Sequence, residues 1–262
     1  MKVRATYSDL PGRRALVTGA SSGIGLGIAE ALLEQGMHVA VHYRSNRAAA
    51  EALCDRFPGR GFPVGADLGV EAGCVHAVAE AARVMGGVEA LVHSAGMWNS
   101  APIDRITSER LDEMFRVNVF SAFYLVREAL PHLRAGQRGR GNIVFIGSTA
   151  GERGEAGHAH YAASKGALQA LCLSLAVELA PAVRTNLVSP GWVRTPMAEA
   201  ELATMGAVIA GALPNRRVAD VEDIVHAVLY LSSDASAHLL GQDLEVSGGA
   251  LLVVPRGQVV AR

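Results

Sequence analysis

A tyrosine and a lysine four positions apart, Tyr161 and Lys165, are the residues whose types and spacing most directly suggest chemistry. On a helix, side chains at positions i and i+4 lie on the same face. An ammonium group about 5 Å from a phenol, at an effective dielectric constant of about 20, favours the phenolate by roughly 3 kcal/mol and lowers its pKa by about two units. The pair therefore predicts a tyrosine suited to general acid–base catalysis, with an ordinary contact on a helix face as the alternative.

A glycine-rich turn lies near the start of the chain. The run Gly19-Ala-Ser-Ser-Gly23-Ile-Gly25 follows the apolar segment Arg14–Thr18 directly and precedes a helical pattern. Glycines placed in this way let the backbone turn tightly and approach a pyrophosphate, whose charge the N-terminus of the next helix stabilises. The turn predicts a dinucleotide site, and a tight turn that binds no ligand is the alternative.

An alternation of strands and helices must position these residues. Short apolar and β-branched runs predict strands at Ala15–Thr18, His38–His42, Phe62–Gly65, Ala90–His93, Gly141–Ile146, Arg184–Val188 and Asp243–Val246. Amphipathic stretches rich in Ala and Leu predict helices near residues 23–35, 46–57, 71–85, 108–134, 160–180 and 220–232. This alternation is typical of right-handed βαβ crossovers. It predicts one α/β domain over residues 1–262, a doubly wound parallel sheet with helices on both faces.

The composition excludes several other classes of protein. The 24 Lys and Arg residues nearly balance the 25 Asp and Glu residues, which argues against a nucleic-acid binder with a basic face. The 29 glycines show no triplet period, so a collagen-like chain is excluded. Three widely spaced cysteines favour buried thiols in a reducing compartment. The sequence has no uninterrupted stretch of 18 apolar residues, so we expect no membrane span. We expect a cytoplasmic protein that binds neither membrane nor nucleic acid.

Further motifs follow the glycine turn in a fixed order. They are Asp67-Leu68, His93-Ser-Ala-Gly96, Asn118, Ser148, Tyr161-x-x-x-Lys165, Pro190-Gly191, Thr195 and the run Gly241-Gln-Asp-Leu-Glu-Val-Ser-Gly-Gly249. Together with Thr-Gly-x-x-x-Gly-x-Gly, they resemble the short-chain dehydrogenase/reductase family from about Arg13 to Leu251. The resemblance implies a Rossmann-like fold of about seven parallel strands. It also implies an oxidoreductase that interconverts a carbonyl and a secondary alcohol with a nicotinamide dinucleotide.

The resemblance assigns roles to four catalytic residues. Tyr161 would exchange a proton with the substrate oxygen while a hydride moves to or from the nicotinamide. Ser148 would hydrogen-bond that oxygen, and Lys165 would also hold the nicotinamide ribose. Asn118 would anchor a water relay to Lys165. The rival interpretation is a non-catalytic relative that binds the dinucleotide as a redox sensor.

The resemblance also implies which residues contact the cofactor. They are Gly19, Ser21, Ser22, Gly23, Ile24, Gly25, Asp67, Leu68, Ser94, Ala95, Gly96, Tyr161, Lys165, Pro190, Gly191, Val193 and Thr195. His93 and Ser94 stand where the family usually has two asparagines, and Ser247 replaces a usual aspartate. We expect a repacked but working site at His93, with a new catalytic acid at that position as the alternative.

The end of the second predicted strand decides between the two dinucleotides. A ribose 2′-hydroxyl favours an acidic partner there, whereas a 2′-phosphate favours a cation. The family's acidic position falls on Tyr43, Arg44 follows it, and no Asp or Glu occurs from Gly36 to Ala50. We therefore expect NADP(H), with Arg44, Ser45 and Asn46 near the phosphate. NAD(H), with Arg44 a solvated residue, is the alternative.

Substrate identity should depend on three loops, Met97–Ala101, Ala150–His160 and Pro196–Pro214. His158 and His160 lack a matching third ligand, so we expect no metal site. The apolar segment at residues 196–214 has a helical period and follows Thr195. It predicts a mobile lid over the substrate, with a packing helix as the alternative.

The 3-oxoacyl-[acyl-carrier-protein] reductases are one similar branch of the family. Their carrier-protein site uses basic residues after two helices, and Arg134, Arg138 and Arg140 supply the first cluster here. The second, at Leu179–Arg184, lacks a basic residue before the strand, so a small carbonyl substrate remains the broader expectation. Apolar residues lie outside one helix face, such as Phe120, Phe123 and Leu173, on helices that family members pair between subunits. The resemblance therefore implies a homotetramer, with a dimer as the alternative.

Overall fold

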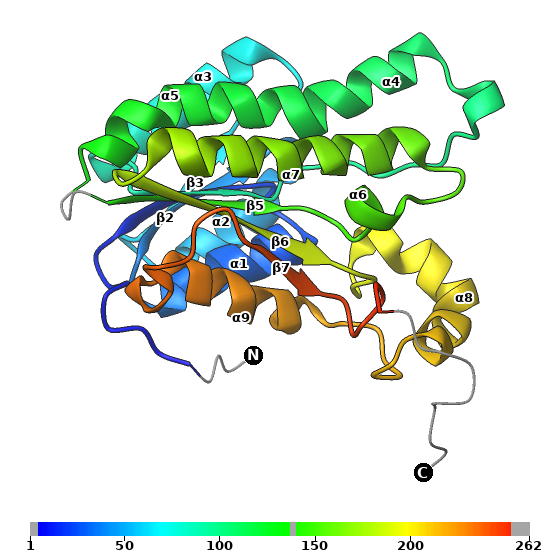
Figure 1. Ribbon diagram of the computed structural model, residues 1–262. Coiled ribbons are helices and arrows are strands. Elements are labelled where there is room, and N and C mark those ends of the chain that lie inside the picture. Colours follow the sequence, from blue (N-terminus) through cyan, green and yellow to red (C-terminus); the bar gives the residue numbers. More distant parts are fainter. Residues whose placement is uncertain (1–4, 137–139, 253–262) are drawn as a thin grey trace.

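The computed structural model describes residues 5–136 and 140–252. Within these ranges, seven parallel strands form one sheet between two layers of helices (Figure 1). The strands lie in the order β3-β2-β1-β4-β5-β6-β7. Their bounds are β1 (Arg14–Thr18), β2 (His38–Tyr43), β3 (Gly61–Gly65), β4 (Ala90–His93), β5 (Gly141–Ile146), β6 (Val183–Pro190) and β7 (Asp243–Val246). The predicted doubly wound, Rossmann-like fold is confirmed.

Helices cover both faces of the sheet (Figure 1). The first layer contains α1 (Gly23–Glu34), α2 (Arg47–Asp55) and α9 (Val221–Ser232), which share one apolar cluster. The second layer contains α3 (Glu71–Met85), α5 (Ser121–Arg134) and α7 (Ala159–Leu179), which share the other. The shorter or more peripheral helices are α4 (Ser108–Phe115), α6 (Ala150–Arg153) and α8 (Glu199–Ala212).

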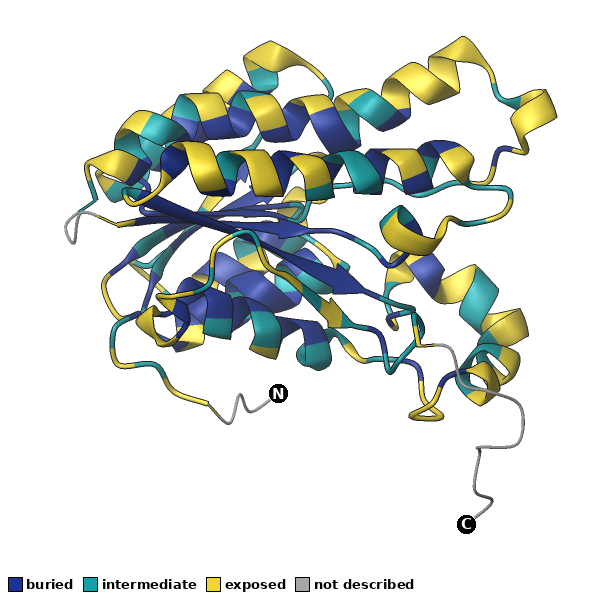
Figure 2. Cartoon of the chain, viewed as in Figure 1, coloured by how far each residue is buried: buried dark blue, intermediate teal, exposed yellow. Residues whose placement is uncertain are grey.

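The inner strands are buried on both faces (Figure 2). Every residue of β4, β5 and β6 is buried, as expected for parallel strands between two helical layers. This explains why nearly continuous apolar runs predicted these strands. At the sheet edge, β7 exposes Asp243 and Glu245 alternately with half-buried Leu244 and Val246.

The strand order reverses where β1 lies between β2 and β4. In doubly wound sheets, such a reversal opens a crevice at the carboxyl ends of the strands. Thr18, the last residue of β1, pairs in register with His93, the last residue of β4. The glycine turn after β1 and the segment Ser94–Gly96 after β4 therefore start side by side.

The prediction of one continuous helix at residues 108–134 is wrong near the middle of that range. The structure has α4, then a π-helical turn at Arg116–Phe120, and then α5. A π-turn is one residue wider than an α-turn and is common at functional sites. It lies at Asn118, a buried residue whose amide contacts a neighbouring loop. The short helix α6 was not predicted.

Helix α7 is long and apolar enough to cross a membrane by length and composition alone. In this fold it packs on β6, and its residues Leu168, Leu171 and Cys172 belong to the apolar core. Its composition is therefore explained by its position as a core helix. Cys54, Cys74 and Cys172 are all buried free thiols, as expected.

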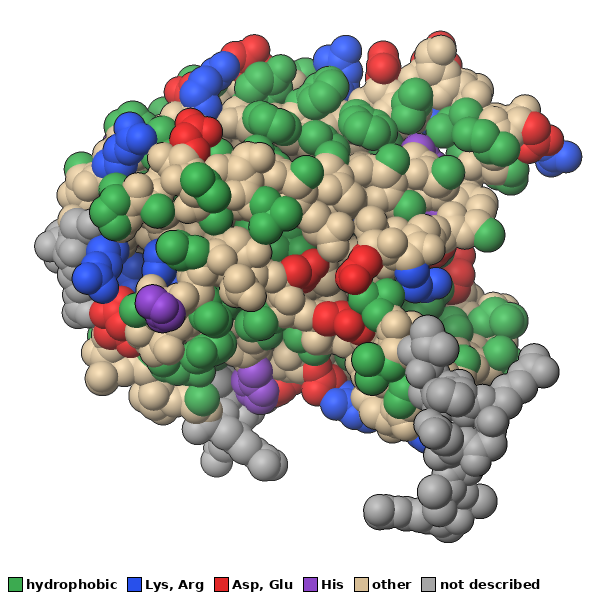
Figure 3. Space-filling view, in the orientation of Figure 1, with side chains coloured by type: hydrophobic (Ala, Val, Ile, Leu, Met, Phe, Trp, Pro, Cys, Tyr) green, Lys and Arg blue, Asp and Glu red, His purple; other side chains and the backbone are tan. Residues whose placement is uncertain are grey.

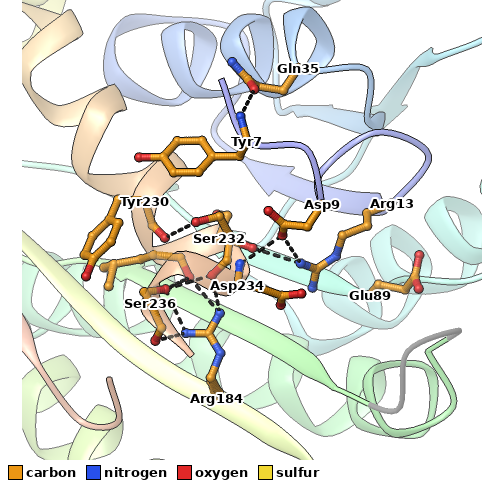
Figure 4. Close-up of polar contacts among 12 residues, drawn as sticks. Tyr7, Asp9, Arg13, Gln35, Glu89, Arg184, Tyr230, Ser232, Asp234 and Ser236 are labelled. Carbon is orange, nitrogen blue, oxygen red and sulfur yellow. Dashed lines mark hydrogen bonds and ion pairs between the residues drawn. The ribbon is translucent and has the colours of Figure 1, made fainter. Parts of the chain in front are cut away.

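Two arginines close the C-terminal end of α9 (Figure 4). The guanidinium of Arg184, on β6, donates to the backbone carbonyls of Leu231, Ser233 and Ser236 at 3.0–3.1 Å. Arg13 donates to the carbonyl of Ser232 at 3.0 Å. Positive charge at this end of a helix complements its dipole. Burial lowers the pKa of Arg184.

Candidate active site

A cleft of about 220 Å³ lies at the carboxyl ends of the central strands. It brings together residues predicted from six separate motifs. Those lining it are Gly19, Ser22, Gly23, Ile24, Gly25, Ser94, Ala95, Gly96, Ser148, Tyr161, Lys165, Pro190, Gly191, Val193 and Thr195. The glycine turn and the tyrosine–lysine pair thus face one cavity.

Six predicted site residues do not line this cleft. Arg44 and Asp67 line a second cleft, Leu68 is buried in the core, and Asn118 is fully buried. Ser21 and Ser45 lie beside the turn, where the carbonyl of Ser21 accepts a hydrogen bond from Asn46 at 3.3 Å. The structure therefore places Arg44 and Asp67 together, apart from the cavity that holds Tyr161.

Steric contacts require glycine in the turn after β1. Gly19 and Gly23 have φ of 63° and 51°, a region that side chains disfavour. A Cβ at Gly25 would lie 2.3 Å from the carbonyl oxygen of Gly19, and a Cβ at Gly19 would lie 2.8 Å from the Cα of Ala95. The backbone can therefore pass close to a ligand at the N-terminus of α1, where unpaired N–H groups favour an anion.

A histidine that was not predicted as a site residue fixes this turn. His42, on β2, accepts a hydrogen bond at Nδ1 from the N–H of Gly19 at 3.0 Å. Its other ring nitrogen lies 3.1 Å from the carbonyl oxygen of Ala66, to which it donates. Burial lowers the pKa of His42 to about 4, so the ring is neutral at pH 7. One buried ring thus joins the loops that follow β1 and β3.

The tyrosine–lysine pair has the predicted neighbours but not the predicted pKa. The Nζ of Lys165 lies 5.8 Å from the centre of the Tyr161 ring and donates to the carbonyl of Ile146 at 2.8 Å. Burial raises the pKa of Tyr161 to about 12, although a hydrogen bond with Ser148 opposes that rise. Burial also lowers the pKa of Lys165 to about 8.

The predicted lowering of the Tyr161 pKa by Lys165 is therefore wrong for this structure. The ammonium lies over the ring and is held by a carbonyl, and desolvation of the phenolate dominates. At neutral pH the phenol is protonated. A protonated phenol beside the Ser148 hydroxyl is suited to donating a proton into the cleft.

Asn118 is buried behind the lining of the cleft and holds the backbone of Met97, which lines it. Its Oδ1 accepts from the N–H of Met97 at 2.8 Å, and its Nδ2 donates to the carbonyl of Met97 and to the hydroxyl of Ser164, both at 3.0 Å. A Cβ on Gly96 would lie 3.4 Å from Asn118 Oδ1 and 3.6 Å from Lys165 Nζ. Asn118 and Lys165 therefore both lie close to the same glycine.

His93 lies beneath the cleft, not in it. It is fully buried, and its Nε2 lies 2.9 Å from the hydroxyl of Ser121 on α5. Burial, with the nearby charge of Lys165, lowers its pKa to about 3. These contacts tie β4 to α5 and leave no path for His93 to act as a catalytic acid. Thr18 accepts from the N–H groups of Ser94 and Ala95, which fixes the same loop.

The outer end of the cleft is lined by Met97, Trp98, Trp192, Arg153 and Met197. Of the predicted substrate loops, all three contribute a residue to this lining. Trp192 was missed because it stands between Gly191 and Val193, both read as cofactor contacts. The ring of His158 stacks on Trp98, while the ring of His160 contacts Asn99 at 2.8 Å. Among the described residues, no group of three His, Cys, Asp or Glu side chains could hold a metal.

Comparison with known proteins places the chain among oxidoreductases. The family described as Enoyl-(Acyl carrier protein) reductase matches residues 19–250. FabG of Escherichia coli, a 3-oxoacyl-[acyl-carrier-protein] reductase, is 34% identical over 94% of this chain and 100% of its own. The uncharacterized oxidoreductase YhxC of Bacillus subtilis is 31% identical over 93% of this chain and 86% of its own. A short-chain glucose/ribitol dehydrogenase from Brucella melitensis superposes with a TM-score of 0.89 at 29% identity, covering 95% and 100% of the two chains.

Proposed function

Because this chain belongs to the short-chain dehydrogenase/reductase family and is such an enzyme, we propose that it reduces a ketone to a secondary alcohol with NADPH. One observation carries the proposal. The glycine turn, the protonated phenol of Tyr161 and the hydroxyl of Ser148 face a single cleft. The opposite direction, alcohol oxidation, uses the same residues with the proton moving the other way.

The residues of the cleft fit a nicotinamide dinucleotide. The turn at Gly19–Gly25 leaves space that a single added Cβ would fill, beside the N-terminus of α1. Lys165 uses one of its three N–H groups on Ile146, so two remain for ribose hydroxyls. When bound, the dinucleotide supplies the hydride that forms the new C–H bond.

The chain's own residues supply the proton and hold the oxygen. The hydroxyl of Ser148 accepts from the N–H of Ala150 at 3.1 Å, which orients it towards Tyr161. Tyr161 donates its proton to the carbonyl oxygen as the carbon gains the hydride, so the C=O double bond becomes one C–H and one O–H bond. We propose that the ammonium of Lys165 offsets part of the cost of the tyrosinate that results, although desolvation leaves the pKa of Tyr161 raised. Asn118 anchors the water relay that restores the proton.

We propose NADP(H) over NAD(H) on the basis of Arg44. This residue follows β2, is exposed, and lines the second cleft together with Arg116. A guanidinium binds a 2′-phosphate by paired hydrogen bonds. Arg44→Ala should lower kcat/KM for NADPH at least tenfold while changing that for NADH less than threefold. Equal losses with both cofactors, or a wild-type preference for NADH, would overturn this assignment.

A small-molecule carbonyl fits this chain better than a substrate linked to a carrier protein. The segment Leu179–Arg184 lacks the expected basic residue, and Arg184 at its end is buried and bonded to carbonyls at the end of α9 (Figure 4). Arg184 therefore cannot offer charge to a partner. Arg134 and Arg140 are exposed, and Arg138 lies outside the described residues.

We also propose a homotetramer, with a dimer as the alternative. Apolar side chains lie exposed along α5 and α7 (Figure 3), where Phe123, Leu173 and Val177 are 52%, 58% and 84% exposed. A helical face of this kind is suited to a copy of itself. Light scattering tests this: a monomeric mass would contradict it.

The buried free thiols support a reducing, cytoplasmic location.

We propose that α8 and the turn before it cover bound substrate as a lid. No residue of α8 is buried, which differs from a helix that packs in a core. Pro196 and Met197, just before it, line the cleft.

Tyr161→Phe tests the proposed chemistry. The variant should lose ketone reduction by at least a thousandfold while binding NADPH within threefold of the wild type, measured by nucleotide fluorescence. If the wild type binds NADPH but reduces no ketone and oxidises no alcohol in a broad panel, a redox-sensing role replaces the enzymatic one.

A further inference from the structure

The chain has two tryptophans, and both line the outer end of the active-site cleft. Trp98 follows β4, and Trp192 follows β6, so they reach the cleft from separate loops. Large aromatic side chains contribute much of the energy at binding sites. Their shared position suggests that the substrate contacts both indoles.

The two indoles form a corner with a histidine behind it. The ring of His158 lies flat on Trp98, with centroids 4.6 Å apart and an interplanar angle of 3°. Trp192 stands at 83° to Trp98, with centroids 5.9 Å apart. We call Trp98, Trp192 and His158 the aromatic corner. Such a corner offers a face and an edge to an incoming ring, the two arrangements that aromatic pairs prefer.

Hydrogen bonds hold the loops that carry both indoles. On the Trp98 side, Met97 is bonded through N–H and C=O to Asn118, and Asn99 contacts His160 at 2.8 Å. On the other side, the carbonyl of Trp192 accepts from the N–H of Ala219 at 3.1 Å. A site fixed before binding loses little freedom when a ligand enters, which favours a rigid partner.

The corner has several apolar neighbours. Met97, Pro196 and Met197 line the same cleft, which also includes Arg153 and Glu155. Burial of an apolar ring against the three apolar side chains is favourable. Thioethers also contact aromatic rings favourably.

We propose that the enzyme selects ketones that carry a flat, apolar aromatic ring, and that the aromatic corner binds this ring. The inference rests on the proposed carbonyl reduction. Ser148 and Tyr161 would hold the carbonyl, and the inference concerns the part of the substrate remote from it.

Two bicyclic ketones test the proposal. 2-Tetralone and 2-decalone share a ten-carbon skeleton and an unconjugated carbonyl, but only 2-tetralone has an aromatic ring. We expect kcat/KM with NADPH to favour 2-tetralone by about twofold to tenfold, the range that one aromatic pair provides. In the enzyme saturated with NADP⁺, 2-tetralone should quench tryptophan emission at a correspondingly lower concentration than 2-decalone.

Variants of the two tryptophans test whether the aromatic corner causes the preference for 2-tetralone. Trp98→Leu should bring the ratio of the two ketones to about one, whereas Trp98→Phe should keep most of the preference. Trp192→Leu serves as an independent second variant if Trp98→Leu does not fold. An equal or reversed preference in the wild type, an unchanged ratio in both Leu variants, or faster turnover of an aldose than of 2-tetralone would overturn the inference.

The two proposals fail in different ways. If neither ketone is reduced, the failure belongs to the proposed function, and the fluorescence titration still decides whether the corner prefers the aromatic ring. If both are reduced without preference, carbonyl reduction stands and the aromatic selection is refuted.

Discussion

Replacing His42 with phenylalanine removes the ring that joins the glycine turn to the loop after β3. His42 is 2% exposed, accepts from the N–H of Gly19 and contacts the carbonyl of Ala66. Phenylalanine keeps the ring but has no polar atom, so the N–H of Gly19 and the carbonyl of Ala66 both lose this partner. Each group that loses its partner costs about 1–3 kcal/mol. His42→Phe should therefore lower the free energy of unfolding by about 2–6 kcal/mol at pH 7.5.

The cost of this substitution should shrink as the pH falls. Burial holds the pKa of His42 at about 4, against 6.5 in the unfolded chain. Below pH 6.5 the unfolded chain takes up a proton that the folded protein does not, so stability is lost by about 1.4 kcal/mol per pH unit until pH 4. At pH 5 the wild type has lost about 2 kcal/mol through this group. The variant lacks the group and loses nothing there.

Urea unfolding at pH 7.5 and pH 5.0 measures both effects. His93, whose pKa burial lowers to about 3, destabilises both proteins equally in acid and cancels in the comparison. His38→Phe is the matched control, because His38 lies on the same strand and its Nδ1 has no hydrogen-bond partner. We expect the control to change stability by less than about 1 kcal/mol. A penalty below about 1 kcal/mol for His42→Phe at pH 7.5, or one that does not shrink at pH 5.0, would refute the reasoning.

Two further substitutions test the turn and the buried arginine. Gly25→Ala should weaken NADPH binding at least tenfold in fluorescence titrations, because its Cβ would lie 2.3 Å from the carbonyl oxygen of Gly19; unchanged affinity would contradict the proposed pyrophosphate site. Arg184→Met should lower the free energy of unfolding by about 3 kcal/mol in urea, since it removes the hydrogen bonds from the buried guanidinium to three carbonyls at the end of α9, each worth about 1 kcal/mol. The exposed Arg134→Met should change it by less than about 0.5 kcal/mol, and equal effects of the two would show that the buried contacts contribute little.

The sheet could be predicted because its signal is local. The bounds of β4 and β5 match those predicted, since strands buried on both faces are mostly apolar along their length, here with His93 and Asn142 as the polar exceptions. The π-helical turn at Arg116–Phe120 could not be predicted. The same amphipathic pattern continues through it, and its position depends on contacts between Asn118 and a loop 21 residues earlier.

Some residues of the candidate site could also be predicted from short motifs, and others could not. The glycine turn and the Tyr161–Lys165 pair are short motifs, so their types and spacing were sufficient to place them in one cleft. The role of His42 depends on β2 lying beside β1, which is a property of the fold. The pKa of Tyr161 was misjudged because a distance to Lys165 says nothing about desolvation. The contacts of Arg184 could not be predicted, because they depend on β6 and α9 lying together.

Isotope transfer tests the central claim most directly. The wild type is given a ketone and NADPH that carries deuterium at the transferring position of the nicotinamide, and the alcohol is analysed by mass spectrometry. The account predicts one deuterium on the carbinol carbon, and no alcohol from Tyr161→Phe under the same conditions. An alcohol without deuterium, or formation of the alcohol by Tyr161→Phe at the wild-type rate, would contradict it.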